Sequence, residues 1–101
     1  MILVRDVFRL KFGKARDALA VWKEMAEQGR RSGAMATPPR ILTDLVGPYY
    51  TLVMETTAKD LQTWEADMKK GMGDPNFHTL YQKFTPLVES GYREIFTIQE
   101  M

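Results

Sequence analysis

The sequence predicts a single small α+β domain over residues 1–101, with its elements in the order β-α-β-β-α-β. Three observations carry this prediction. Apolar residues alternate near each end of the chain, as in strands. Two long segments repeat apolar residues at helical spacing, and a pair of β-rich runs lies between them. The length of 101 residues fits one domain.

The first strand is predicted over Ile2–Phe12, where side chains alternate between two faces and Gly13 follows. One face is apolar, with Ile2, Val4, Phe8, Leu10 and Phe12, and the other carries Arg5, Val7, Arg9 and Lys11.

The first helix follows, and its apolar stripe comprises Ala15, Ala18, Leu19, Trp22, Met25 and Ala26. Ser32-Gly33 is the predicted end, because glycine readily takes the left-handed conformation that closes helices. Small residues and prolines then predict a mobile loop over residues 32–39.

A hairpin is predicted next. Ile41–Val46 and Tyr49–Thr56 are rich in β-forming residues, and Gly47-Pro48 between them is a turn signal.

The second helical region is predicted to begin with a capping box, in which Asp60 follows three residues after Thr57. Its apolar stripe breaks at 71–73 and restarts at Asp74-Pro75, an N-cap followed by a proline suited to the first helical position.

The end of this region is marked by Pro86, which should kink or restart the helix, and by Gly91, where the helix is expected to end. Alternation over Tyr92–Gln99 predicts the last strand.

This order predicts a ferredoxin-like fold, a four-stranded antiparallel sheet with two helices on one face. The other face stays open, although most strands are apolar on both faces. An apolar face of that size is rare on a monomer. We therefore expect a homodimer through the open sheet face, with a cavity between the two sheets.

The chain resembles the dimeric α/β-barrel superfamily and, within it, the small NIPSNAP-like proteins. The matching residues span nearly the whole chain: Leu10-Lys11-Phe12-Gly13-Lys14, Trp22, Trp64, and the run from Asp74-Pro75-Asn76-Phe77 to Pro86-Leu87-Val88. The sequence departs from the family at Phe12, where proline is usual, and at Asp6, where NIPSNAP-like members often have arginine.

The resemblance also implies candidate site residues. Haem-degrading and cofactor-independent monooxygenases of this superfamily have a polar residue near Asp6 and a tryptophan near Trp64. Their helix histidine falls nearer Tyr81 than His78, so the set is incomplete here.

Asp6 and His78 are the candidate catalytic residues. Asp6 interrupts the apolar face of the first strand, where a carboxylate is costly unless it is paired or solvated. A β-bulge that turns it outward, or an ion pair with an arginine of the same strand, would explain it structurally. His78 is the only histidine and suits proton transfer near neutral pH, or it is an ordinary helix residue.

Arg5, Arg9, Trp64 and Tyr81 are the candidate ligand-binding residues. The two arginines lie on one strand face and can hold a carboxylate or enolate. They can equally pair across strands or across the dimer, with partners among Glu55, Asp44 and Glu94. The helical aromatic residues, at the spacing of an apolar stripe, are as readily explained as core.

Composition excludes several function classes. The net charge of +1 argues against a nucleic-acid binder, and residues 49–54 lack the motif of RNA-recognition domains. The chain has no cysteine and no phosphate loop or metal-ligand motif, so neither metal nor cofactor is expected. The apolar run at the N-terminus is too short for a signal peptide or a membrane span, which favours the cytoplasm.

Three functions fit these patterns. The first is a dimeric barrel protein that binds a small apolar or aromatic molecule. The second is a cofactor-independent monooxygenase or isomerase that acts on an enolisable aromatic substrate. The third is a non-catalytic structural or stress-associated dimer.

Overall fold

The computed structural model describes residues 1–33 and 39–101, and it confirms the predicted order of elements with the second helix divided in two. The elements are β1 (Ile2–Leu10), α1 (Ala15–Ser32), β2 (Arg40–Thr43), β3 (Thr51–Ala58), α2 (Leu61–Met72), α3 (Pro75–Phe84), a 3₁₀ turn (Thr85–Leu87) and β4 (Val88–Thr97). None of the described helices is long and apolar enough to cross a membrane.

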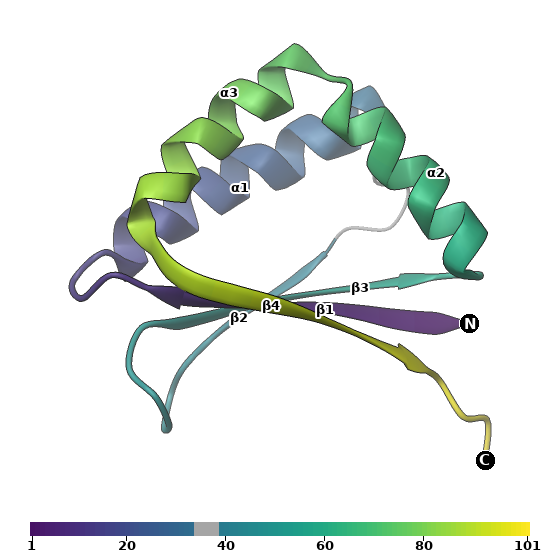
Figure 1. Cartoon of the computed structure of the whole chain (residues 1–101), viewed down its shortest axis with the longest axis horizontal. Coiled ribbons are helices and arrows are strands. Elements are labelled where there is room, and N and C mark those ends of the chain that lie inside the picture. Colours follow the sequence, from purple (N-terminus) through teal and green to yellow (C-terminus); the bar gives the residue numbers. More distant parts are fainter. Residues whose placement is uncertain (34–38) are drawn as a thin grey trace.

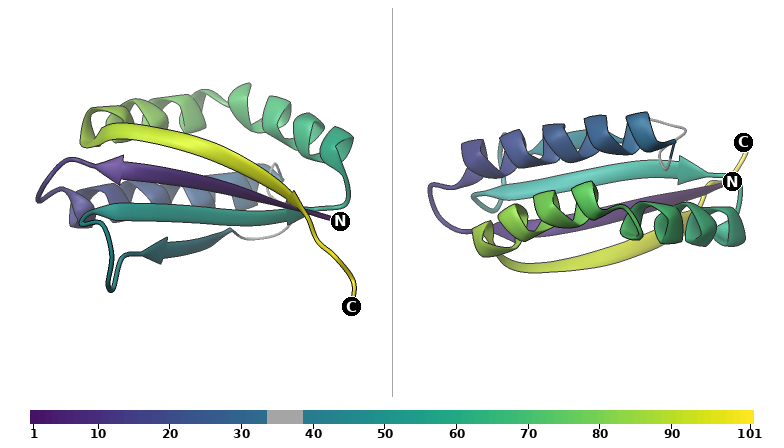
Figure 2. Two further views of the ribbon diagram at one scale, coloured as in Figure 1. Left: turned by 60° about the horizontal axis from the view of Figure 1, so that its bottom comes forward. Right: turned by 90° about the horizontal axis from the view of Figure 1, so that it is seen from above.

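The four strands form one antiparallel sheet in the order β2-β3-β1-β4. The helices α1, α2 and α3 lie on the same side of it, and the described residues leave the opposite face uncovered (Figure 1). α1 runs along one half of the sheet, while α3 and α2 follow one another along the other half (Figure 2). The predicted ferredoxin-like fold is therefore confirmed.

The pairing of the strands decides which side chains face the helices. Residues directly opposite each other on neighbouring strands share a face. Asp6 lies opposite Met54 on β3 and Arg93 on β4, so these three share one face of the sheet. That face is the one toward the helices, because all three line the space between the sheet and the helical layer. The buried core forms on the same side, from Leu10, Ala18, Trp22, Met25, Leu52, Met54 and Phe84.

The uncovered face carries the other half of each strand. One row across the sheet alternates in charge, with Arg40, Glu55, Arg5 and Glu94 in succession. The adjacent row is apolar and consists of Leu42, Val53, Val7 and Tyr92. Opposite charges as direct neighbours favour this register, because a slip of one residue would move every side chain to the other face.

Several predicted boundaries were wrong, and the hairpin shows why. β2 ends at Thr43 instead of Val46, and the side chain of Asp44 accepts a 3.0 Å hydrogen bond from the backbone N–H of Thr51. This bond closes a loop longer than the predicted turn. Leu45 and Val46 consequently lie in the loop, 95% and 94% exposed.

The second helical region also begins differently from the prediction. Asp60 itself caps α2, accepting a 2.8 Å hydrogen bond from the backbone N–H of Thr63, whereas Thr57 belongs to β3. The predicted restart at Asp74-Pro75 is confirmed as the N-cap and first turn of α3. At the end of α1, Gly33 takes the predicted left-handed conformation, and residues 34–38 of the predicted loop lie outside the described residues.

The strands at both ends of the chain also differ in length. β1 ends at Leu10 and leaves Phe12 exposed. β4 begins at Val88, so Gly91 lies inside a strand and does not end a helix. A Cβ atom at Gly91 would lie 2.9 Å from Cδ1 of Phe8, so glycine is needed there to make room for that ring.

Candidate functional site

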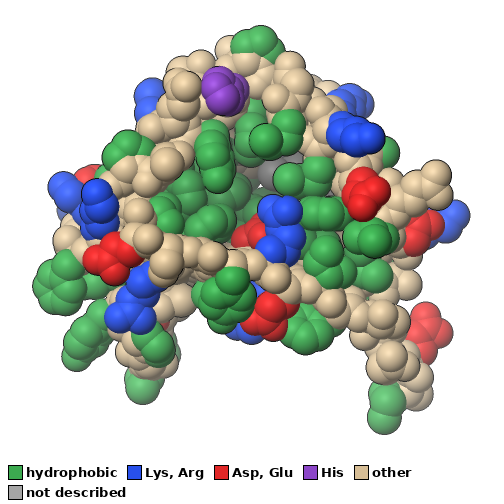
Figure 3. Space-filling model, viewed as in Figure 1, with side chains coloured by type: hydrophobic (Ala, Val, Ile, Leu, Met, Phe, Trp, Pro, Cys, Tyr) green, Lys and Arg blue, Asp and Glu red, His purple; other side chains and the backbone are tan. Residues whose placement is uncertain are grey.

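A cavity of about 730 Å³ lies between the sheet and the helical layer. The space-filling view shows it as a hollow surrounded by apolar side chains (Figure 3). The lining includes aromatic rings and methionines from both layers: Phe8, Trp22, Met54, Trp64, Met68, Met72, Phe77 and Tyr81. Such a lining suits a planar apolar molecule.

Two rings of the inner wall, Phe8 and Trp22, belong to a cluster of aromatic rings from three elements. The ring of Trp22 on α1 lies 6.0 Å from that of Phe8 on β1 and 5.4 Å from that of Phe84 at the end of α3. Phe8 and Phe84 meet edge to face at 5.0 Å. Edge-to-face packing holds rings in fixed positions, which gives this wall a defined shape.

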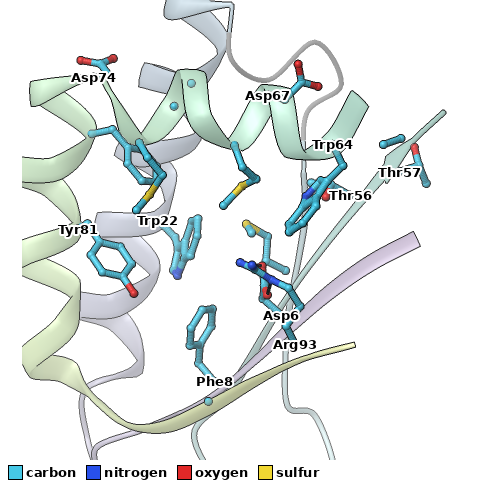
Figure 4. Close-up of a pocket in the computed structure, with 18 of the residues that line it drawn as sticks. Asp6, Phe8, Trp22, Thr56, Thr57, Trp64, Asp67, Asp74, Tyr81 and Arg93 are labelled. Carbon is cyan, nitrogen blue, oxygen red and sulfur yellow. Dashed lines mark hydrogen bonds and ion pairs between the residues drawn. The ribbon is translucent and has the colours of Figure 1, made fainter. Parts of the chain in front are cut away.

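The polar part of the cavity is built on Asp6. Its carboxylate accepts hydrogen bonds from Nε of Arg93 at 2.6 Å and from Nη2 at 3.4 Å. The guanidinium carbon of Arg93 also lies 4.9 Å from the ring centre of Trp64. Figure 4 shows Asp6 and Arg93 pointing toward each other, with Trp64 of α2 beside the pair. An ion pair and a cation–π contact thus hold Arg93 in one orientation.

The indole nitrogen of Trp22 is the other notable polar atom of the lining. Nε1 is buried and has no hydrogen-bond partner among the described residues. Its neighbours in the cluster are aromatic rings, whose faces attract an N–H group only weakly.

The rim of the cavity includes Asp74, which ties two helices together. Its carboxylate accepts a 3.0 Å hydrogen bond from the side chain of Gln28 on α1 and a 2.9 Å bond from the backbone N–H of Asn76. These bonds hold the pKa of Asp74 below its usual value, with the Gln28 amide as the largest cause. α1 and the start of α3 are therefore joined at the cavity rim.

The structure brings three of the six predicted site residues together. Asp6, Trp64 and Tyr81 all line the cavity. Neither proposed structural explanation of Asp6 was right: it faces inward, the irregularity of β1 lies between Arg9 and Leu10, and its arginine partner comes from β4.

The other three predicted residues lie elsewhere. His78 is exposed on α3, with Gln82 as its side-chain neighbour at 3.3 Å, and it does not line the cavity. Arg5 and Arg9 lie on the uncovered face of the sheet, where Arg5 pairs with Glu55 at 3.4 Å. The cross-strand pairing considered for Arg5 is thus confirmed. The cavity of the single chain lies on the helix side, not on the uncovered face where the sequence placed it.

Arg93 is the site residue that the sequence did not reveal. Its only local signal is a basic residue within a predicted strand, in the alternating set opposite Tyr92, Phe96 and Ile98. Recognition of its partner requires the register between β1 and β4, because Asp6 and Arg93 are 87 positions apart in the chain. Within the described residues no group of three or more acidic or histidine side chains is placed to hold a metal ion.

Comparison with known proteins bears on the fold. No family model and no curated protein matches the sequence. Among solved structures, a NIPSNAP family protein of unknown function from Agrobacterium tumefaciens, Atu4242, is 19% identical, with 95% of this chain and 86% of that chain covered and a TM-score of 0.85. A second from the same organism, Atu5224, is 15% identical over 98% and 93% of the two chains, with a TM-score of 0.87.

A putative antibiotic biosynthesis monooxygenase from Nitrosomonas europaea is also similar, at 15% identity over 99% of this chain and 100% of that chain, with a TM-score of 0.76. At these identities the likeness concerns the backbone and not the chemistry of the site. The resemblance inferred from the sequence is confirmed for the fold. The chain has the fold that NIPSNAP family proteins and antibiotic biosynthesis monooxygenases share.

Proposed function

We propose that this protein binds a small apolar or aromatic molecule in the cavity between its sheet and its helices. The lining of the cavity is the main support for this proposal. Aromatic rings and methionines line a cavity of about 730 Å³, and the Asp6–Arg93 ion pair lies among them. That volume lies within the range of roughly 300–1,000 Å³ that is usual for small-molecule sites. Methionine side chains adapt their shape to a ligand at little cost.

Tryptophan fluorescence tests the proposal directly, since both tryptophans of the chain, Trp22 and Trp64, line the cavity. Titration with 2-ethylnaphthalene should change the emission saturably. Met68→Arg, which places a charge in the lining, should weaken binding at least tenfold. Leu61→Arg on the same helix is the control, because Leu61 is exposed and outside the lining. The absence of a saturable change, or equal weakening by both variants, contradicts the proposal.

A second candidate function is proton transfer on an enolisable aromatic substrate, and the carboxylate of Asp6 in the cavity favours it. In such a step the C–H bond beside a carbonyl breaks and the proton passes to an Asp6 oxygen. The electron pair moves to the carbonyl oxygen as an enolate, which the N–H groups of Arg93 would stabilise. The Asp6 carboxylate already accepts two hydrogen bonds from Arg93, so binding remains the first proposal.

Deuterium exchange into 2-tetralone, followed by NMR in D₂O, tests this step. Catalysed exchange should fall to the buffer rate in Asp6→Asn and stay unchanged in His78→Ala, since His78 lies outside the cavity. An unchanged rate in Asp6→Asn excludes Asp6 as the base. Oxygen uptake with a naphthalene-diol substrate tests the monooxygenase form of the same proposal.

We further propose that two copies of the chain pair through the uncovered sheet face. Leu42, Tyr92 and Phe96 on this face are 37%, 58% and 47% exposed in the single chain, an unusual arrangement for a sheet that remains in water. The β2–β3 loop projects from the same side (Figure 1). Light scattering at micromolar concentration should report a dimer, and Val7→Lys should reduce its mass to that of a monomer.

A monomeric wild-type protein contradicts the pairing. A dimer that binds none of the aromatic probes would instead favour the third function, a structural module without a ligand.

A further inference from the structure

Arg93 is the polar side chain best placed to meet a molecule in the cavity. Its side chain is 42% exposed, whereas that of its partner Asp6 is only 7% exposed. A ligand therefore reaches the guanidinium more easily than the carboxylate beneath it. Trp64 and Asp6 already hold the guanidinium in place, so little conformational entropy remains to be lost when a ligand binds.

The guanidinium has hydrogen-bond donors left over. An arginine carries five N–H groups, and Asp6 accepts from Nε and Nη2. Among the described residues no other acceptor contacts Arg93. The remaining N–H groups are available to an oxygen atom of a ligand, and bonds from a charged donor are about twice as strong as neutral ones.

The charges around the cavity decide which kind of oxygen fits. Asp6 cancels the charge of Arg93, and the described lining also includes Asp67 and Asp74 against one further cation, Lys59. An anionic ligand bound to Arg93 would meet the carboxylate of Asp6 at close range. An uncharged carbonyl oxygen accepts from Arg93 without that repulsion.

We propose that Arg93 selects the ligand, by donating to the carbonyl oxygen of an uncharged aromatic ketone or aldehyde whose ring lies against the aromatic wall. This proposal rests on the proposed binding function and names its ligand class. Asp6 is then a positioning residue, which orients the guanidinium and cancels its charge. Trp64 covers one side of the guanidinium and separates it from water on that side.

Three probes that share one ring system test the proposal: 2-acetylnaphthalene, 2-ethylnaphthalene and 2-naphthoate. Each is titrated by isothermal calorimetry into the wild-type protein. We expect 2-acetylnaphthalene to bind roughly tenfold more tightly than either of the others, equivalent to about 1.4 kcal/mol. The ethyl probe reports the contribution of the ring alone, and the carboxylate reports the penalty for negative charge.

The discriminating variant is Asp6→Asn/Arg93→Met, which removes both charges together and so leaves no buried carboxylate unpaired. In this variant the acetyl and ethyl probes should bind within about twofold of each other, with folding verified by circular dichroism. Arg9→Met is the matched control, because Arg9 lies on the opposite face of the sheet. It should keep the full preference for the acetyl probe.

The outcomes separate this inference from the binding function on which it rests. Equal binding of the acetyl and ethyl probes to the wild-type protein overturns the role of Arg93 but leaves cavity binding intact. A preference for the acetyl probe that survives in the double variant does the same. Tightest binding of 2-naphthoate overturns the assignment of an uncharged ligand. Failure of all three probes to bind overturns the binding function and this inference with it.

Discussion

The two members of the Asp6–Arg93 pair should not be equally important for stability. The side chain of Asp6 is 7% exposed and that of Arg93 is 42% exposed. Arg93→Met leaves a buried carboxylate without its partner, whereas Asp6→Asn leaves a guanidinium that reaches water. The cost of removing a charge partner depends on how well the remaining charge is solvated.

The magnitudes follow from that difference. Loss of one member of a buried ion pair costs about 3–5 kcal/mol, and the open cavity beside Asp6 places Arg93→Met near the lower end, at about 3 kcal/mol. The side-chain amide that Asp6→Asn introduces still accepts a hydrogen bond from Arg93, so that variant should lose only about 1 kcal/mol. The double variant Asp6→Asn/Arg93→Met should be more stable than Arg93→Met alone.

Urea unfolding at pH 7 measures these differences. Far-ultraviolet circular dichroism is the suitable signal, because both tryptophans lie at the site and their emission would change for local reasons. The protein concentration is kept constant across variants, since association affects the midpoint. A loss in Asp6→Asn equal to or larger than that in Arg93→Met would refute the reasoning, as would strict additivity in the double variant.

Three further predictions follow from local geometry. Gly91→Ala places a Cβ 2.9 Å from the Phe8 ring and should lower the free energy of unfolding in urea by about 1–2 kcal/mol. Gly73→Ala is the control: the nearest atom to its Cβ is 3.4 Å away, so it should cost less than half as much. Gly33→Ala should cost about 1 kcal/mol, because residue 33 has a φ of 77° that alanine adopts poorly, and an unchanged midpoint would contradict this. The folded-state pKa of Asp74 is lowered, so its stabilising contribution is present above the unfolded value of 3.8 and is lost as the pH falls through the folded value. The difference in melting temperature between wild type and Asp74→Asn should accordingly be largest near neutral pH and should vanish in acid. A difference that stays the same from neutral pH into acid would contradict the assignment.

The fold could be predicted from the sequence because most of its signals are local. Alternation in β1, the apolar stripe of α1 and the cap at Asp74-Pro75 each depend on residues close together in the chain. The boundary at Gly91 was wrong because it depends on a contact between distant segments. Gly91 looks like a helix stop in the sequence, yet it is the residue of β4 that makes room for Phe8.

The candidate site was predictable only in part, for the same reason. Asp6 stands out because a carboxylate interrupts an apolar face, and Trp64 and Tyr81 stand out as aromatic residues. Arg93 resembles any charged residue of a strand until the register places it opposite Asp6. The location of the cavity could not be predicted either, because it depends on how far α2 stands from the sheet, and side-chain periodicity does not determine that distance.

The character of α2 has a consequence for evolution and design. None of its residues is buried, although several of its side chains line the cavity. This helix therefore lacks the interior that would ordinarily hold it to the sheet, and an occupant of the cavity would supply one. Substitutions that fill the space with larger apolar side chains should make the protein more stable and close it to ligands at once. A variant selected for heat resistance alone would be expected to lose the space that the fold leaves open.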